Sequence, residues 1–175
     1  MRCSLPLFLL CAACHPLSLY APPELPTGAP LQLASAVKGN VEVLVDGRGV
    51  PHIYAGTIPD AVYGLGFMHG RDRLFQVMLL QHASQGRPTE LFGDELLATD
   101  RRLRLTAWGL DAQLAALGED DRRILDAYAA GLTAGGQHAG QSAELALLKL
   151  QPPHFSARDA LSILRLQAWQ LAVDH

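Results

Sequence analysis

The sequence predicts an α+β protein that is mostly helical, with a β-hairpin near its start and packed helices after it. Residues 41–55 are rich in Val and Ile and begin with apolar and polar residues in alternation, which is typical of strands. From about residue 60, apolar residues recur every three or four positions, which is the helical period. With 175 residues, 49% hydrophobic and 18% charged, the chain is expected to fold as one domain.

The hairpin is expected from two strands, at about 41–46 and 50–55, joined by a short loop. Gly47 and Gly49 in this loop adopt the positive φ angles that tight hairpin turns need. Pro51 has no N–H, so it belongs at the start of the second strand or at a sheet edge.

A long helix is expected over about 60–84, where Asp60 is suited to its positively charged N-terminal end. Gly64, Gly66 and Gly70 lie within it, although each glycine costs an exposed helix about 1 kcal/mol relative to alanine. Three glycines in one helix therefore predict close backbone packing against another element.

Each later helix is bounded by residues that start or stop helices. Gly86 ends the long helix, Pro152 and Pro153 stop a short one, and Ser156 is the candidate N-cap of the last. The expected helices span 88–93, 97–117 with an interruption near Gly109, 119–134, 144–150 and 156–174.

Residues 1–14 are expected to be a secretory signal, because Arg2 precedes a short apolar run and then small residues. The run "CAAC" is similar to a bacterial lipobox and makes Cys14 the candidate lipidated residue. Ordinary cleavage after Ala13 is the alternative. The protein is therefore expected to be exported, either to the periplasm or as a membrane-anchored lipoprotein. Residues 15–38 contain five prolines and are expected to form an extended tether, with the folded part beginning near Gly39.

Composition argues against several functions. The net charge is −3 and most basic residues are dispersed, so a nucleic-acid surface is not expected. All three cysteines lie in the first fourteen residues, which excludes a disulfide framework or a cysteine zinc site in the rest of the chain. The sequence has no G-x-S-x-G turn, no phosphate-binding loop and no histidine pair at helical spacing. No catalytic or metal-ligating residue is therefore assigned in this chain.

Four segments nevertheless occur in an informative order: "GVPHIYA", "DAVYGLGFMHGRDRLFQV", "QGRPTELFG" and "LDAYAAGLTA". Together they resemble the N-terminal part of the penicillin acylase (penicillin amidase) family, which also contains acyl-homoserine-lactone acylases. The resemblance covers roughly residues 41–175.

This resemblance implies an N-terminal-nucleophile hydrolase with an αββα fold, of which residues 39–175 would be an incomplete α chain. In such enzymes the precursor cuts itself, and the new N-terminal Ser of the larger β chain attacks an acyl amide, with its own amine as base. The chemistry would need no cofactor. A structural calcium ion is implied in the complete enzyme. Asp174 is the nearest acid, but it is not assigned as a ligand, because the matching acid comes about one helical turn later.

The resemblance also assigns roles to residues of this chain. His52, Asp72 and Arg73 match family motifs, and we interpret them as buried hydrogen-bonding residues that fix the strand-to-helix geometry rather than as catalysts. The last helix would line the pocket for the acyl group. Its pocket positions are Ala168, Leu171 and Ala172.

Three hypotheses follow. The favoured one is the N-terminal portion of an amidase that hydrolyses β-lactam side chains or related N-acyl compounds, and the second is a fragment of an acyl-homoserine-lactone acylase. The third is a non-catalytic lipoprotein or truncated paralogue that uses the same surface to bind a partner.

Overall fold

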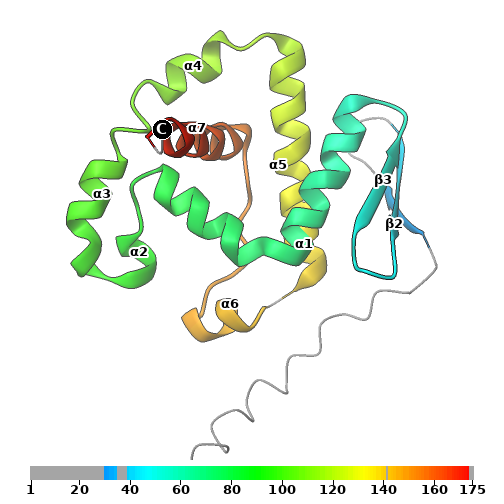
Figure 1. Cartoon of the computed structure of the whole chain (residues 1–175), viewed down its shortest axis with the longest axis horizontal. Coiled ribbons are helices and arrows are strands. Elements are labelled where there is room, and N and C mark those ends of the chain that lie inside the picture. Colours follow the sequence, from blue (N-terminus) through cyan, green and yellow to red (C-terminus); the bar gives the residue numbers. More distant parts are fainter. Residues whose placement is uncertain (1–29, 35–38, 141, 174–175) are drawn as a thin grey trace, which may run out of the picture.

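The computed structural model describes residues 30–34, 39–140 and 142–173, and shows a small antiparallel sheet beside a group of helices (Figure 1). The sheet has the order β1-β2-β3. The strands are β1 (Leu31–Ala34), β2 (Asn40–Val45) and β3 (Pro51–Ala55), and the main helices are α1 (Ile58–Ser84), α5 (Glu119–Ala139) and α7 (Ala157–Val173). The predicted hairpin and the mostly helical α+β class are thus confirmed.

Strand β1 corrects one expectation, because it lies inside the segment that we predicted to be a tether without secondary structure. Leu31 and Leu33 alternate with polar or small residues, and Leu33 is only 8% exposed. β1 pairs with β2 in a register that sets Leu31 against Val43. An extended segment of the kind that the prolines indicated can also pair as a strand. The predicted signal with Cys14, and residues 15–29 and 35–38 of the predicted tether, lie outside the described residues.

The hairpin loop is organised by Asp46. Its carboxylate accepts hydrogen bonds from the backbone N–H groups of Arg48 at 2.8 Å and Val50 at 3.0 Å. These backbone hydrogen bonds lower the pKa of Asp46. Of the two loop glycines, Gly49 has the positive φ, at 82°, and Gly47 does not.

Helices α1 and α5 pack against each other through glycine, as the sequence predicted for α1. A Cβ atom added at Gly70 would lie within 3.0 Å of the Leu132 backbone in α5, and one added at Gly135 would lie as close to the Phe67 backbone in α1. At four glycines, two in each helix, an added Cβ atom would lie too close to the backbone of the facing helix. These are Gly66, Gly70, Gly131 and Gly135. The two backbones are therefore closer than any side chain between them would allow.

Helix α1 begins at Ile58, slightly before the expected start at about residue 60, and Asp60 lies in its first turn as expected. Thr57 caps the helix by accepting a hydrogen bond from the N–H of Asp60 at 3.3 Å, and its hydroxyl donates to the Asp60 carboxylate at 2.6 Å. The helix bends at Arg73, whose φ of −136° is not helical. The first half of α1 thus follows α5 and the sheet, and the second half turns towards α7 (Figure 1).

The shorter helices are α2 (Thr89–Phe92), the 3₁₀ turn η3 (Asp94–Leu96), α3 (Leu97–Leu103), α4 (Leu110–Ala116) and α6 (Ala143–Leu148). Among them, α3 contacts α1 and α4 contacts α7. The expected single helix over 97–117 is in fact two helices with a turn between them, as the interruption at Gly109 suggested; Gly109 has a φ of 70°. Leu105 and Trp108 in this turn are 72% and 82% exposed, so their apolar character does not reflect core packing.

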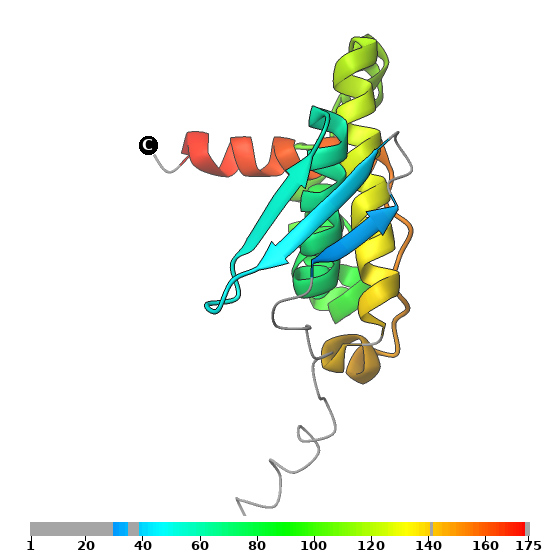
Figure 2. The ribbon, with the colours of Figure 1, turned by 90° about the vertical axis from the view of Figure 1, so that its right-hand side faces the viewer.

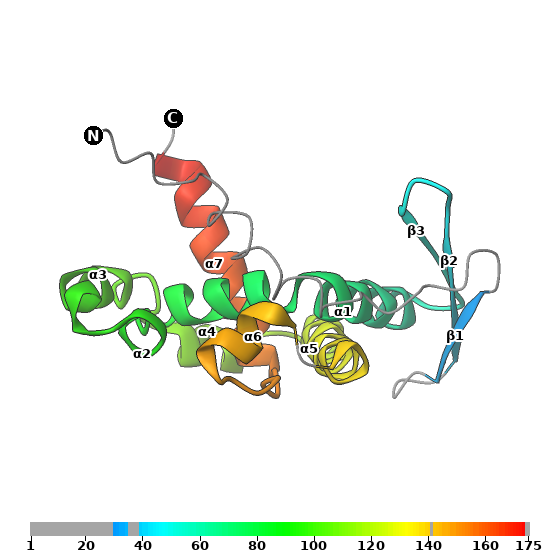
Figure 3. The ribbon, with the colours of Figure 1, turned by 90° about the horizontal axis from the view of Figure 1, so that it is seen from below.

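Two arms project from the same side of the helical body, namely the β2–β3 hairpin and the C-terminal half of α7 (Figure 2, Figure 3). The core lies behind them, where Val41 and Val43 of β2 are at most 1% exposed and pack on Phe67 of α1. None of the described helices has the length and apolar character that crossing a bilayer requires.

Candidate functional site

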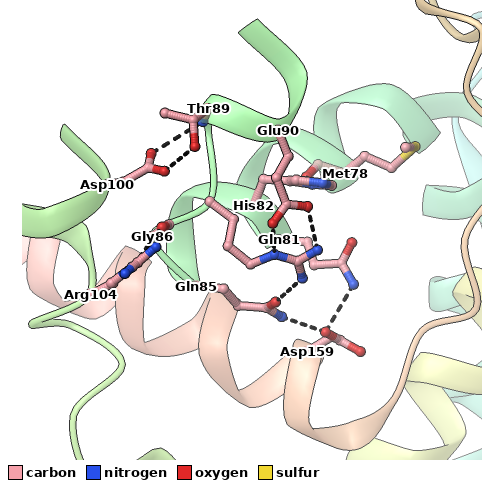
Figure 4. Close-up of polar contacts among 11 residues, drawn as sticks. Met78, Gln81, His82, Gln85, Gly86, Thr89, Glu90, Asp100, Arg104 and Asp159 are labelled. Carbon is pink, nitrogen blue, oxygen red and sulfur yellow. Dashed lines mark hydrogen bonds and ion pairs between the residues drawn. The ribbon is translucent and has the colours of Figure 1, made fainter. Parts of the chain in front are cut away.

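Asp159 fixes the start of α7 to the end of α1 (Figure 4). One carboxylate oxygen accepts hydrogen bonds from the side-chain amides of Gln81 at 2.9 Å and Gln85 at 2.6 Å. The other accepts from the backbone N–H of Ser156 at 2.8 Å and from its hydroxyl at 2.5 Å. Ser156 in turn accepts from the Asp159 N–H at 3.4 Å, which confirms it as the cap of α7 through a reciprocal capping arrangement.

These contacts keep Asp159 ionised. Burial raises its pKa, but the hydrogen bonds from Ser156, Gln81 and Gln85 outweigh burial and hold the pKa below the usual value for aspartate. A second contact lies one turn further along α7, where the hydroxyls of Ser84 and Ser162 are 2.8 Å apart and both residues are buried. The position of α7 on α1 is therefore set by polar contacts between buried or half-buried groups.

The segment after α1 is tied down next to Asp159 (Figure 4). Arg87 makes a bidentate ion pair with Glu90, with both N–O distances at 2.6 Å. The hydrogen bonds of this pair raise the pKa of Arg87 and lower the pKa of Glu90. The buried Asp100 of α3 accepts hydrogen bonds from the N–H and hydroxyl of Thr89. Arg104 donates to the carbonyl of Gly86 at 3.2 Å.

The three predicted pocket residues lie together on the C-terminal half of α7. Ala168, Leu171 and Ala172 are all exposed, and Leu171 is 68% exposed. The shallow depression beside Leu171 is lined by α7 residues alone within the described part of the chain. This part therefore supplies at most one wall of a pocket at these positions.

A more enclosed cavity, of about 490 Å³, lies one turn earlier, between α1, α5 and α7. Its lining is mainly apolar and includes Val77, Leu125 and Ile163. It also contains a polar pair, because the Nδ1 atom of His69 lies 2.8 Å from the hydroxyl of Tyr128. Burial lowers the pKa of His69 and raises the pKa of Tyr128, so both rings are neutral at pH 7. We name this cavity the α1–α5–α7 groove.

The structure corrects our interpretation of His52, Asp72 and Arg73, which are exposed rather than buried. His52 lies on β3 with its Nε2 atom 3.5 Å from the Asp46 carboxylate, so it supports the hairpin loop. Asp72 pairs with Arg71, at 2.7 and 2.9 Å, and not with Arg73. The expected burial was wrong because the "GRDR" motif does not show which arginine faces the core. The Arg71 side chain is the buried one, at 3% exposure.

Sequence reasoning named Ser156 as a cap but missed the other polar groups that hold the helices together. Ser156 and Asp159 have the spacing of a capping box and were recognisable from it. The contacts of Asp159 to Gln81 and Gln85 join residues more than seventy positions apart, and no local pattern indicates them. Among the described residues, no group of three or more His, Cys, Asp or Glu side chains has the arrangement of a metal site. We therefore assign no calcium ligand, and Asp174 lies outside the described residues.

Comparison with known proteins identifies the family. The penicillin amidase family model matches residues 40–175. The chain is 35% identical to the penicillin G acylase of Escherichia coli over 58% of its length, and 34% identical to the penicillin acylase 2 proenzyme of Pseudomonas sp. (strain SE83) over 71%. It is 29% identical over 86% of its length to the acyl-homoserine lactone acylase QuiP of Pseudomonas aeruginosa. The matched segments span only 12%, 16% and 18% of these relatives.

A solved structure agrees with this match. The thermostable penicillin G acylase from Alcaligenes faecalis superposes with a TM-score of 0.68 and 26% identity. The superposition covers 78% of this chain and 76% of the solved chain, so the two chains are similar in length. The chain corresponds to a partial, N-terminal portion of the penicillin acylase fold and belongs to the penicillin amidase family.

Proposed function

We propose that this chain is the N-terminal portion of an exported amidase that hydrolyses acyl amides, and that the nucleophilic Ser lies in a larger partner chain. The observation that carries the proposal is the family match over residues 40–175 combined with a span of less than a fifth of each of the three relatives compared. In the part of the chain that the structure describes, the site offers scaffold groups, such as the Asp159 contacts, rather than a nucleophile with its base.

In the complete enzyme, the chain's contribution to the substrate site is the exposed half of α7. Ala168, Leu171 and Ala172 form the wall that meets the acyl group, and residues outside this chain supply the others. All three side chains are apolar and two are small, so the pocket is wide and has no cation at these positions. Each methylene group of a ligand buried there contributes about 0.8 kcal/mol. We therefore propose a preference for long aliphatic or bulky acyl groups over phenylacetyl.

The test uses the full-length enzyme. We expect a higher kcat/KM on C8–C12 acyl amides than on phenylacetyl amides. Ala172→Phe should shift this ratio towards phenylacetyl by roughly tenfold, because the larger ring fills the space that a long chain occupies. The matched control is Ala115→Phe on α4, an exposed alanine outside the α7 wall. A parent enzyme that already prefers phenylacetyl, or an unchanged ratio in Ala172→Phe, would reject the assignment of the pocket.

The second candidate is an acyl-homoserine-lactone acylase. It is favoured by the relative in Pseudomonas aeruginosa that matches 86% of this chain, compared with 58% for the Escherichia coli penicillin acylase. Assaying the same full-length enzyme on N-acyl homoserine lactones and on β-lactam amides separates the two. The third candidate, a non-catalytic binding module, predicts no hydrolysis of either substrate.

Export is part of the proposal. Arg2 and the apolar run after it suit a secretory signal, and Cys14 suits lipidation, which would anchor the protein to a bacterial membrane. Cleavage after Ala13 would instead release it into the periplasm. The mass of the mature N-terminal peptide, with or without a lipid on Cys14, distinguishes these two outcomes.

A further inference from the structure

We infer that the α1–α5–α7 groove and Arg73 at its edge form a docking site for one segment of the larger chain, a segment that is apolar and carries a carboxylate. The inference rests on the proposed function, because that function supplies the larger chain. It goes beyond it by naming the surface, the anchoring residue and the chemistry of the segment.

The groove is lined by exposed apolar side chains, which is typical of a surface that a partner covers. Leu65 on α1 and Leu164 on α7 are 41% and 53% exposed and line its two sides. Val77 and Ile163 below them are only 8% exposed. Single exposed apolar residues are common on soluble proteins, whereas a concave apolar surface is typical of an interaction site. The groove, a cavity of about 490 Å³ with mainly apolar lining, is of the second kind.

Arg73 gives the groove its charge. It lines the groove, is exposed, and makes no ion pair or hydrogen bond with any residue of the described part of the chain. The nearby acid Asp72 is already held by Arg71 in a bidentate pair. The His69–Tyr128 pair is satisfied and neutral, so it offers no competing charge. An apolar groove whose Arg73 guanidinium has no partner among the described residues is complementary to an apolar segment that bears a carboxylate.

The position of the groove favours a segment of a large chain over a second copy of this one. The matched segments span 12–18% of the relatives, so most of an acylase polypeptide lies outside them. The β2–β3 hairpin and the C-terminal half of α7 project from the same side of the body, with α1 between them (Figure 2, Figure 3). A large partner seated between these two arms reaches the groove and the exposed side chains of α7 at once.

The test places a photo-crosslinking residue, p-benzoylphenylalanine, at position 164 of the full-length enzyme. Gln137 is the matched control, because it is exposed and lies on the far part of α5, outside the groove lining. We expect irradiation to join position 164 to the larger chain in much higher yield than position 137. Equal yields from the two positions, or a crosslink from position 164 to a second copy of this chain, overturn the inference.

The charge is tested separately. Arg73→Glu is expected to weaken association of the two chains at least tenfold, measured by dissociation on dilution, while Arg73→Lys retains most of it. Arg123→Glu, which alters an exposed arginine on α5, is the matched control and should leave association unchanged. If Arg73→Glu behaves like Arg123→Glu, the carboxylate anchor is wrong. Failure of the proposed function would instead appear as absent hydrolysis, which is measured independently of crosslinking and association.

Discussion

Gly70 occupies a position where any side chain would meet the backbone of α5. Alanine normally favours a helix over glycine by about 1 kcal/mol. Here the added Cβ would lie within 3.0 Å of the Leu132 backbone, which cannot move aside as a flexible side chain could. Steric overlap therefore outweighs the helix preference of alanine, and Gly70→Ala should lower the free energy of unfolding by about 1–3 kcal/mol. Urea denaturation of the chain, followed by circular dichroism, measures this change.

The control for Gly70 is Gly47→Ala in the hairpin loop. No atom lies within 4 Å of a Cβ added there, and its φ is not in the left-handed region. This variant should be within about 0.5 kcal/mol of the parent. Equal urea midpoints of unfolding for Gly70→Ala and Gly47→Ala would contradict the backbone contact between α1 and α5.

Asp159 should make the stability of the chain depend on pH. Its pKa in the folded state is below the usual aspartate value of 3.8, so its stabilising effect is complete above that value. The effect is lost as the pH falls through the lower folded-state pKa. Asp159→Asn should reduce the free energy of unfolding by about 1–2 kcal/mol at pH 7, because charged hydrogen bonds are replaced by fewer neutral ones. The difference should shrink as the pH falls below 3.8.

Urea denaturation at pH 7 and pH 3 checks this pH dependence. Asp111→Asn serves as the control, because Asp111 is an exposed partner of Arg158 and exposed ion pairs contribute little. A difference between parent and Asp159→Asn that stays constant over this pH range would show that the carboxylate charge is not responsible.

At the scale of elements, Asp100 holds the segment from α2 to α3 in place; we call this segment the α2–α3 arm. This buried carboxylate holds the start of α2 through Thr89. Asp100→Ala leaves the N–H and hydroxyl of Thr89 without that partner, at a cost of about 1.5–3 kcal/mol for a charged hydrogen bond. The arm should therefore open more often, and trypsin should cut after Arg101 and Arg102 about tenfold faster or more.

Limited proteolysis with mass spectrometry measures cleavage within the α2–α3 arm. Asp94→Ala is the matched control, since Asp94 is an exposed acid in the same arm. Faster cleavage spread equally over the whole chain would indicate global destabilisation, and would reject a local role for Asp100.

At the scale of the molecule, the isolated chain should bind apolar dyes and hydrolyse no acyl amide. Trp108, Leu147 and Leu171 are each more than two-thirds exposed, and the α1–α5–α7 groove adds a concave apolar surface. Dye fluorescence, light scattering and an amidase assay on the purified chain test both statements. A monomeric chain that binds no dye and unfolds in one sharp transition would favour the binding-module hypothesis. Hydrolysis abolished by substituting a Ser or Thr of this chain would overturn the family-based mechanism.

The sequence by itself determined the elements whose signals are local. The alternation in β2, the helical period of α1 and α5, and the glycines of α1 predicted a hairpin, two long helices and a close contact. The cap at Ser156 and the break before α4 at Gly109 also followed from residue type. The four motifs were sufficient for the family, which the match over 40–175 then established. β1 was missed because four residues are too short for a period to be recognised.

Only the tertiary structure decided which polar residues are buried and what they contact. Asp72 pairs with Arg71, and Arg73 has no ion pair within the described residues, although the sequence "RDR" allows either pairing. Asp159 meets Gln81 because α7 crosses the end of α1, and that crossing depends on the bend at Arg73. Which side chains are buried, and which ions pair, depends on how helices and strands pack against one another. That packing joins residues far apart in the sequence, so a local sequence pattern does not predict it.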